Sequence, residues 1–209
     1  MGPFCLAESR YPRFSLSKII RWDIKASIDL MEKWEFRIQT ESPGDTQKVG
    51  EIIGGSAQPG DIYLLTGPLG AGKTCLSQGI ARGLGVPENL RSPTFVLMTR
   101  HQGRLVLHHL DLYRINDPWE AWDLGLDEQL LGEGVCVVEW ADKAEEIFPA
   151  ESCWIELDYG PGDDSRNLMI TVDSGSTAPS RYELLIKELK MIFETDWEAK
   201  GAVERKDDE

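Results

Sequence analysis

The chain has 209 residues, of which 36 are acidic and 22 are basic, so its formal net charge is −14. A surface with this excess of negative charge repels a phosphate backbone, which argues against a protein that holds nucleic acid through its own charge. The 41% hydrophobic content is enough for one buried core, and no run of about 18 apolar residues is present to cross a membrane.

The N-terminal third is expected to begin with an extension and then to become ordered. Residues 1–30 show no sustained periodicity and predict a disordered N-terminal segment, with ordered patterning from just after Met31. Residues 34–40 alternate in polarity like a strand. Ser42 supplies the start chemistry of a short helix that is expected to run through Ile53.

The remaining segments alternate between strands and helices. The elements expected in chain order are strand 60–67, helix 72–85, a hairpin of strands 94–100 and 104–111, helix 117–131, strand 134–140, short helix 141–148, a hairpin of strands 153–160 and 166–173, and helix 181–193. Alternating strands and helices predict an α/β fold, and the hairpins make part of the sheet antiparallel. We therefore expect a single α/β domain over residues 31–175 with a mixed sheet and flanking helices, then a C-terminal helix and charged tail at 176–209.

The cysteines and the N-terminus indicate a cellular compartment. The four cysteines are widely spaced and form no CxxC pair; they are Cys5, Cys75, Cys136 and Cys153. This pattern is typical of reduced, buried thiols rather than of a disulfide framework. The first thirty residues also lack the apolar stretch of a secretory signal. The expected location is cytoplasmic.

The segment GPLGAGKT at residues 67–74 gives the strongest chemical signal. It matches G-x-x-x-x-G-K-[ST] at every fixed position, and it follows an apolar strand and opens a helix. Three glycines let the backbone turn so that N–H groups converge on phosphate oxygens; they are Gly67, Gly70 and Gly72. Lys73 would reach the β- and γ-phosphates, and the Thr74 hydroxyl would be a ligand of Mg²⁺. The loop predicts a P-loop NTPase-like fold that binds a nucleotide.

Two acids end apolar strands and complete the expected site. Asp111 ends the run LVLHHLD and is expected to complete the Mg²⁺ shell, although an acid there also suits a turn cap. Glu139 ends GVCVVE and either ligates Mg²⁺ or orients the attacking water, the alternative being an exposed strand-end acid. His108 and His109 interrupt the first run and, without a third ligand at metal spacing, are expected to pack rather than to bind zinc.

The loop alone does not say which P-loop protein this is. No [NT]KxD motif is present to read guanine, so a GTPase is disfavoured. A small-molecule kinase would need a basic lid, for which Arg91 and Arg100 are candidates, but residues 117–151 carry eleven acids against Lys143 alone. The kinase stays open as the alternative. The acidic segment is itself either a solvated face or a docking face for a basic partner.

Five motifs stand in an order that resembles the TsaE family: GPLGAGKT (67–74), SPTF (92–95), HHLDLYR (108–114), DPWEAWDLGLDE (117–128) and VVEW (137–140). This resemblance implies a bacterial ATPase that acts in making N6-threonylcarbamoyladenosine at position 37 of tRNAs that read ANN codons. ATP and Mg²⁺ would be its cofactors. Its partners would be the proteins of the tRNA threonylcarbamoyl transferase complex, similar to TsaB and TsaD, so that tRNA is reached only indirectly.

The resemblance also implies roles for single residues. The phosphates would be wrapped by Gly70, Ala71, Gly72, Lys73, Thr74 and Cys75. Thr94 would lie in a switch-like loop near the γ-phosphate. Lys73, Asp111 and Glu139 would be catalytic, and the two acids would serve the Mg²⁺ site together with Thr74.

Further roles concern the base and the loop. Thr46, in the segment that starts at Ser42, would border the adenine, and Arg166 would close the other side. Pro68 departs from the family pattern, in which an acid follows the first glycine of the loop.

The implied mechanism is slow, partner-regulated ATP hydrolysis that drives or resets a partner complex. The acidic region 117–151, which contains Trp119, Trp122 and Trp140, would dock that complex. A protein that acts only as an ATP-bound scaffold, with incidental hydrolysis, is the non-enzymatic alternative.

Overall fold

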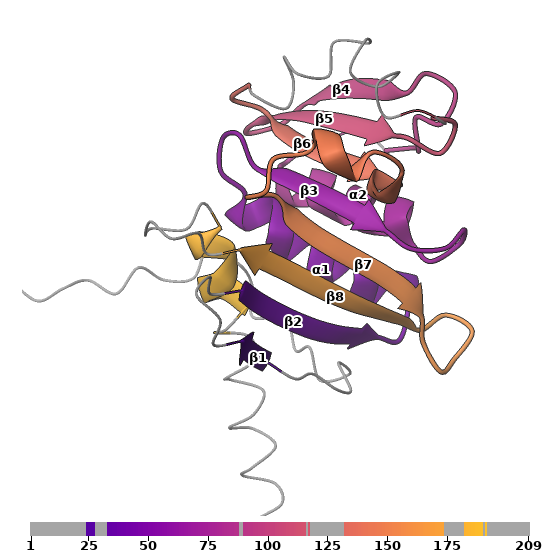
Figure 1. Ribbon diagram of the computed structural model, residues 1–209, viewed down its shortest axis with the longest axis vertical. Helices are drawn as coiled ribbons and strands as arrows, with labels where there is room; N and C mark the ends of the chain where they lie inside the picture. Colours follow the sequence, from indigo (N-terminus) through magenta and orange to yellow (C-terminus); the bar gives the residue numbers. More distant parts are fainter. Residues whose placement is uncertain are drawn as a thin grey trace, which may run out of the picture.

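The computed structural model describes residues 24–27, 33–87, 90–115, 117, 132–173, 182–189 and 191. The elements are β1 (Ile24–Ser27), β2 (Lys33–Thr40), α1 (Pro43–Ser56), β3 (Ile62–Thr66), α2 (Lys73–Gly83), β4 (Met98–Gln102), β5 (Val106–Asp111), β6 (Val135–Glu139), η1 (Ala141–Lys143), η2 (Glu145–Ile147), β7 (Cys153–Tyr159) and β8 (Arg166–Asp173). Residues 183–189 form a further helical segment. Figure 1 shows these elements arranged around one twisted sheet.

The eight strands form one mixed sheet in the order β1-β2-β8-β7-β3-β6-β5-β4. The four central strands β7, β3, β6 and β5 run parallel, and antiparallel pairs extend the sheet on both sides. The predicted hairpins correspond to the pairs β4–β5 and β7–β8. The expected P-loop NTPase-like α/β class, with a mixed sheet and antiparallel hairpins, is confirmed.

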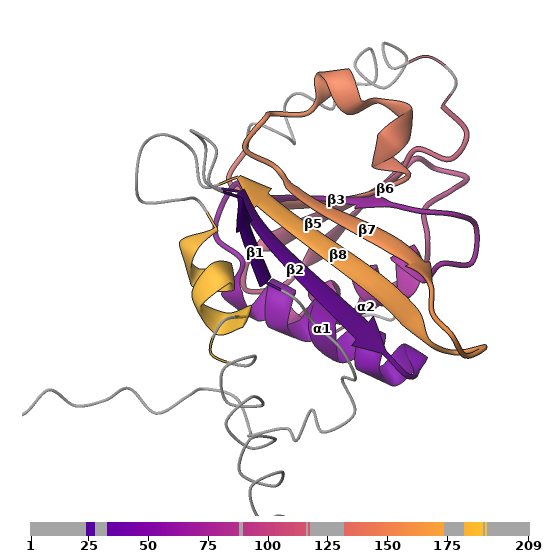
Figure 2. The same ribbon diagram turned by 60° about the horizontal axis from the view of Figure 1, so that its bottom comes forward.

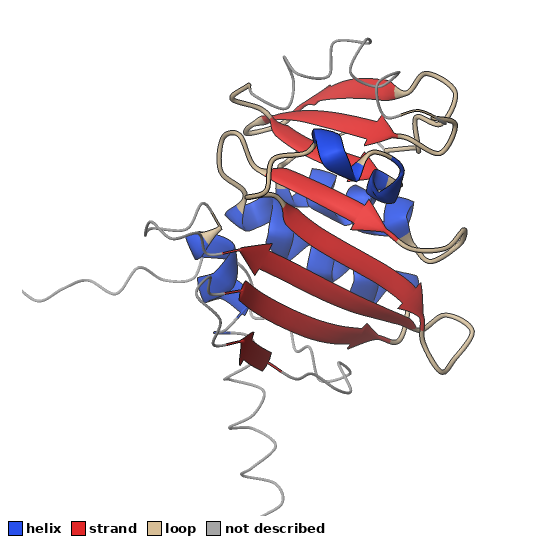
Figure 3. Cartoon of the chain, in the orientation of Figure 1, coloured by secondary structure: helices blue, strands red, loops and turns tan. Residues whose placement is uncertain are grey.

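Helices cover both faces of the sheet, as Figures 2 and 3 show: α1 and α2 lie on one face, and the short turns η1 and η2 on the other. The core on the α1–α2 face joins Tyr63 and Val137 of the sheet to Ile80 of α2. The core on the opposite face joins Leu64 and Val138 to the η1–η2 segment. Strands buried on both faces read as continuous apolar runs, which is why 134–140 was recognisable.

Helix α1 begins where the sequence predicts and ends three residues later. Ser42 is extended, with φ −149°, and its Oγ accepts a hydrogen bond from Asp45 N at 3.2 Å. The helix then continues past Ile53 to Ser56. Its last turn packs directly on α2, where Gly54 meets the backbone of Ile80. This tertiary contact keeps the end of the helix ordered.

Two predicted elements differ in form. The strand expected to start at residue 94 starts at Met98, because the backbone turns at Leu97, which has φ 66°. The helix expected at 141–148 consists of two single 3₁₀ turns, because Ala144 has φ −151° and interrupts the helical path.

The ends of the chain contribute to the sheet and the core. Ile24–Ser27, expected to be disordered, form β1 and pair antiparallel with β2, so the extension expected over residues 1–30 is wrong for these four. Tyr182, before the C-terminal helical segment, accepts hydrogen bonds from Ile62 N and Cys153 N through its hydroxyl.

The predicted helix 117–131 lies outside the described residues except for Asp117. Among the described helices, none has the length and apolar character needed to span a bilayer.

Candidate functional site

The candidate site lies where the loops leave the carboxyl ends of the central parallel strands. The glycine-rich loop links β3 to α2, and β5 and β6 end beside it at Asp111 and Glu139, whose Cα atoms are register partners. Ligands of open α/β sheets bind in this position, because loops from neighbouring parallel strands converge there. The topology therefore brings the motifs of residues 67–74, 108–114 and 137–140 to one edge of the sheet.

The glycine-rich loop has the backbone that its glycines allow. Gly67, Gly70 and Gly72 have φ of 125°, 79° and 102°, a region that other residues rarely adopt. At Gly67 a side chain would also overlap the carbonyl of Leu157 in β7. Gly72 precedes α2 and brings no side chain to cap it. The first-turn N–H groups of α2 are thus available to an anion at the positive end of the helix.

Lys73 is a buried cation held by neutral groups. It is 5% exposed, and its Nζ donates to the carbonyls of Gly67 at 2.5 Å and Pro68 at 2.9 Å. The ammonium lies 3.5 Å from the centre of the Trp140 ring. Burial lowers the pKa of Lys73, against the opposing charges of Glu139, Asp142 and Asp111. Among the described residues no carboxylate forms an ion pair with it, so this cation suits an incoming anion.

Glu139 is a buried carboxylate with three side-chain neighbours. It is 2% exposed, so its charge needs hydrogen-bond donors. Oε2 accepts from Thr74 Oγ1 at 2.7 Å. Oε1 lies 2.7 Å from His109 Nε2 and 3.0 Å from Ser77 Oγ. The alternative of an exposed strand-end acid is wrong, because Thr74 and Ser77 of α2 cover the end of the strand.

Asp111 holds the loop that precedes β4. Its Oδ2 accepts hydrogen bonds from the hydroxyls of Ser92 and, at 2.5 Å, of Thr94. Its Oδ1 accepts from Tyr113 N at 2.9 Å, which is the hydrogen bond of a turn cap. Asp111 therefore caps the turn after β5 and ties the SPTF segment to the site.

The other predicted residues lie around this centre. Arg166 reaches the loop, with Nη2 donating to Gly70 O at 3.2 Å. Thr46 is buried in the first turn of α1, and its Oγ1 lies 2.9 Å from that of Thr40. The thiol of Cys75 contacts Pro43 O at 3.2 Å. Burial raises the pKa of Cys75, and the nearby charges of Arg82 and Arg166 only partly oppose this shift.

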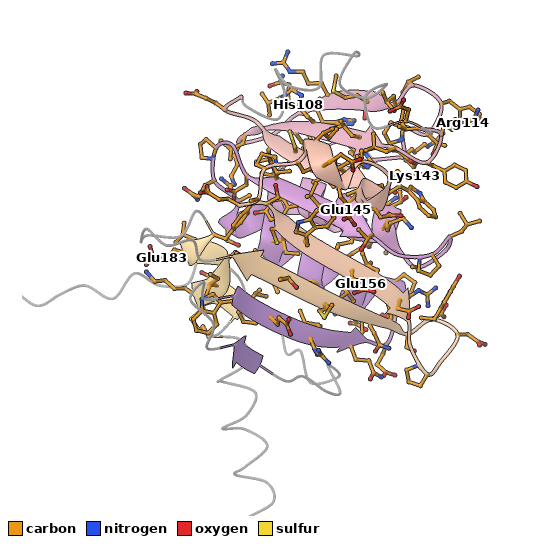
Figure 4. The ribbon with its side chains drawn as sticks, viewed as in Figure 1. His108, Arg114, Lys143, Glu145, Glu156 and Glu183 are labelled. Carbon is orange, nitrogen blue, oxygen red and sulfur yellow. The ribbon has the colours of Figure 1, made fainter. Side chains whose placement is uncertain are left out.

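Several contacts at this edge were not found from the sequence. Tyr159 of β7 donates to Leu69 O at 2.5 Å and so fixes the outer side of the loop. Ser77 and His109 contact Glu139. The available signal was the alternation of β5, which places His109 on the same face as Asp111. Figure 4 labels Arg114 and Lys143 at the same edge, where they lie over the rings of Phe95 and Tyr113 at 4.4 and 5.9 Å.

The donor set suits Mg²⁺ rather than zinc. Mg²⁺ prefers oxygen ligands, keeps several waters, and is held by one or two carboxylates beside substrate phosphates. The Thr74 hydroxyl and the Glu139 carboxylate provide such oxygens 2.7 Å apart. Within the described part of the chain, no three His, Cys, Asp or Glu side chains gather as an all-protein metal site. Together with the buried Lys73, the residues present fit a phosphate with its magnesium ion.

A loop with three left-handed glycines between a parallel strand and a helix, followed by a buried lysine and flanked by two strand-end acids, defines a protein of the P-loop NTPase fold. Sequence comparison gives the family. The family model described as "Threonylcarbamoyl adenosine biosynthesis protein TsaE" matches residues 40–168. The chain belongs to the TsaE family.

Known relatives agree with this assignment. The chain is 41% identical over 158 residues to a "tRNA threonylcarbamoyladenosine biosynthesis protein TsaE" of Bacillus subtilis, covering 75% of this chain and 92% of that protein. A protein of the same name from Treponema pallidum is 39% identical over 121 residues, covering 58% of this chain and 90% of its own length. The crystal structure of Bacillus subtilis YdiB is similar with a TM-score of 0.62 and 36% identity, covering 77% of this chain and 96% of that one.

Proposed function

We propose that this protein binds Mg·ATP at the loop of residues 67–74 and hydrolyses it slowly, and that this supports threonylcarbamoyl modification of adenosine 37 in tRNAs that read ANN codons. The hydrogen bond of 2.7 Å between Thr74 and Glu139 carries the proposal. It places a phosphate-loop hydroxyl and a buried carboxylate together, beside the cation of Lys73. The family and the names of its relatives support the tRNA pathway.

The residues of the chain divide the work of hydrolysis. The N–H groups of the loop and Lys73 stabilise negative charge on the phosphoryl oxygens. Glu139 orients the attacking water and, with Thr74 and Asp111, would hold Mg²⁺. When bound, this ion would neutralise charge shared by the β- and γ-phosphates. Thr94 and Ser92, tied to Asp111, would report the state of the nucleotide to the surface.

Partner proteins would use the energy of ATP. In this proposal the chain does not attach threonylcarbamoyl to adenosine; it drives or resets a transferase complex whose proteins are similar to TsaB and TsaD. The acidic region 117–151 would dock that complex. Its described part contains six acids besides Glu139: Asp117, Glu133, Asp142, Glu145, Glu146 and Glu151.

Calorimetry tests the nucleotide site. Lys73→Ala should weaken ATP binding about 100-fold. The variant removes the ammonium that would pair with a phosphate of ATP, and truncating one member of a buried charge pair costs on the order of 3 kcal/mol. Lys187→Ala is the control, because Lys187 pairs with Glu183 on the C-terminal helical segment. Unchanged affinity in the Lys73 variant would refute the loop assignment.

Turnover assays separate the alternatives. Glu139→Ala should retain or weaken nucleotide binding and show little hydrolysis. In the wild type, the tRNA-modifying partners should stimulate ATP hydrolysis. Phosphate transfer to a metabolite instead would favour the small-molecule kinase. Full tRNA modification by a hydrolysis-dead variant that still binds ATP would favour the scaffold.

A further inference from the structure

The two carboxylate oxygens of Glu139 have separate partners. Oε2 faces Thr74, whereas Oε1 faces His109 and Ser77. The Ser77 hydroxyl also lies 3.0 Å from Lys73 O, and its one proton can serve only one of these two acceptors at a time. His109 is therefore the donor that Oε1 does not share with the helix backbone.

The surroundings of His109 explain why this contact is specific. The side chain is fully buried, on the face of the sheet that carries Leu107 and Val137 and that α2 covers. In the register of β5 and β6, His109 pairs with Val137 and Asp111 with Glu139, so His109 is a diagonal neighbour of Glu139 on one face. A polar ring in apolar surroundings is costly unless it is hydrogen-bonded. For packing alone, an aliphatic side chain would serve better.

The ring nitrogens indicate the direction of the hydrogen bond. Nδ1 of His109 is buried and has no hydrogen-bond partner among the described residues. A neutral imidazole has one proton and one acceptor nitrogen. A proton on Nδ1 would leave an unsatisfied N–H and would turn the lone pair of Nε2 toward a carboxylate oxygen. The proton therefore belongs on Nε2, which donates to Glu139 Oε1 over 2.7 Å.

We propose that His109 is a positioning residue for Glu139, an inference that rests on the proposed function. By holding Oε1, it keeps Oε2 directed at the Thr74 hydroxyl and at the Mg²⁺ that the two residues would share. The terminal torsion of a glutamate is broad and roughly two-fold. Without this donor the carboxylate turns more freely and presents its oxygens to the loop in more than one orientation.

Four variants test the role of His109. His109→Leu removes the donor and keeps an apolar filling. His109→Gln places an amide N–H near the position of Nε2, whereas the shorter His109→Asn does not reach it. His108→Leu is the matched control, because His108 is the preceding residue of β5, has no described contact with Glu139, and lies half-buried on the opposite face (Figure 4).

Two measurements separate positioning from a loss of structure. In EDTA, calorimetry should give the same ATP affinity for His109→Leu as for the wild type, because the loop and Lys73 are intact. Mg²⁺ should raise the ATP affinity of His109→Leu about tenfold less than it raises that of the wild type. The kcat of the variant should fall between about 10- and 100-fold. Both are the usual effects of losing a hydrogen-bond partner of a metal ligand. His109→Gln should recover most of both values, and His109→Asn should not.

The outcomes are distinct. The positioning role would be overturned if His109→Leu showed the same Mg²⁺ response and the same kcat as His108→Leu. Equal defects in the Gln and Asn variants would also overturn it. Should thermal unfolding show that His109→Leu does not fold, the Gln and Asn pair decides, since both keep a polar side chain. A wild type that does not bind ATP would overturn the proposed function and this inference together; one that binds and hydrolyses ATP isolates the failure to His109.

Discussion

A methyl group on Gly50 of α1 would lie 2.8 Å from the Cα of Gly79 on α2 and 2.5 Å from Leu76 O. The two helices therefore pack backbone against backbone. Gly54, four residues after Gly50, and Gly83, four after Gly79, meet the backbone of the opposite helix even more closely. This packing holds the start of α1 beside the phosphate loop.

Gly50→Ala should lower the free energy of unfolding by about 3 kcal/mol, at the upper end of the usual cost of overpacking, because backbone rather than a side chain must move. Gly44→Ala is the matched control in the same helix, where the nearest atom to a new methyl group is Ser42 Oγ at 3.6 Å. That variant should be neutral or slightly stabilising. Chemical denaturation measures both, and equal stabilities would contradict the close contact.

The pair of Lys73 and Trp140 should report nucleotide binding. The ammonium lies 3.5 Å from the centre of the ring, and phosphate should draw it away, which changes the emission of Trp140. The chain has 7 tryptophans, all of which contribute to the fluorescence. The measurement is therefore the ATP-induced change in fluorescence of the wild type minus that of Trp140→Phe. Trp154→Phe should keep the change, because Trp154 packs against the same core as Trp140 but contacts the ring of Phe148 and not Lys73. Loss of signal in the Trp154 variant instead would contradict the assignment.

Arg104 caps the end of α1 from the hairpin of β4 and β5. Its Nη2 donates to the carbonyls of Gly54, Gly55 and Ala57 at 2.7 to 2.9 Å. Because the side chain is exposed, Arg104→Ala should cost only about 1 kcal/mol of unfolding free energy. Arg100→Ala on the same hairpin should stay within about 0.5 kcal/mol of the wild type. Thermal unfolding distinguishes the two, and an equally stable Arg104 variant would rule out the cap.

Stability should fall in alkali partly because of Cys136. Burial raises the pKa of this thiol from 9.0 to about 12. Above pH 9 the unfolded chain loses this proton while the folded chain keeps it. The contribution of the thiol to the free energy of unfolding is therefore fully present below pH 9 and decreases as the pH rises toward 12. Between pH 9 and 12, the free energy of unfolding of the wild type should fall by about 1.4 kcal/mol more per pH unit than that of Cys136→Val. Urea titrations at several pH values measure this difference, and parallel curves would contradict it.

The order of elements was largely predictable because their signals are local. The alternation in residues 34–40, the capping chemistry at Ser42 and the glycines of residues 67–74 each act within a few residues of themselves. The turn at Leu97 and the break at Ala144 were not predictable from local pattern. The carbonyl of Leu97 accepts a hydrogen bond from Asp111 N, and Ala144 is fully buried in the core against the sheet. Likewise β1 depends on pairing with β2, so its own four residues carry little signal.

By itself, the sequence determined the phosphate loop, the two acids that end apolar strands, and the mixed α/β class, because backbone freedom and hydrophobic periodicity are properties of short segments. Only the tertiary structure decided that β3 lies between β6 and β7, and that His109 meets Glu139 from thirty residues away in the chain. Hydrogen bonds between strands that are distant in sequence depend on sheet order and register, and neither is encoded in the spacing of a single motif.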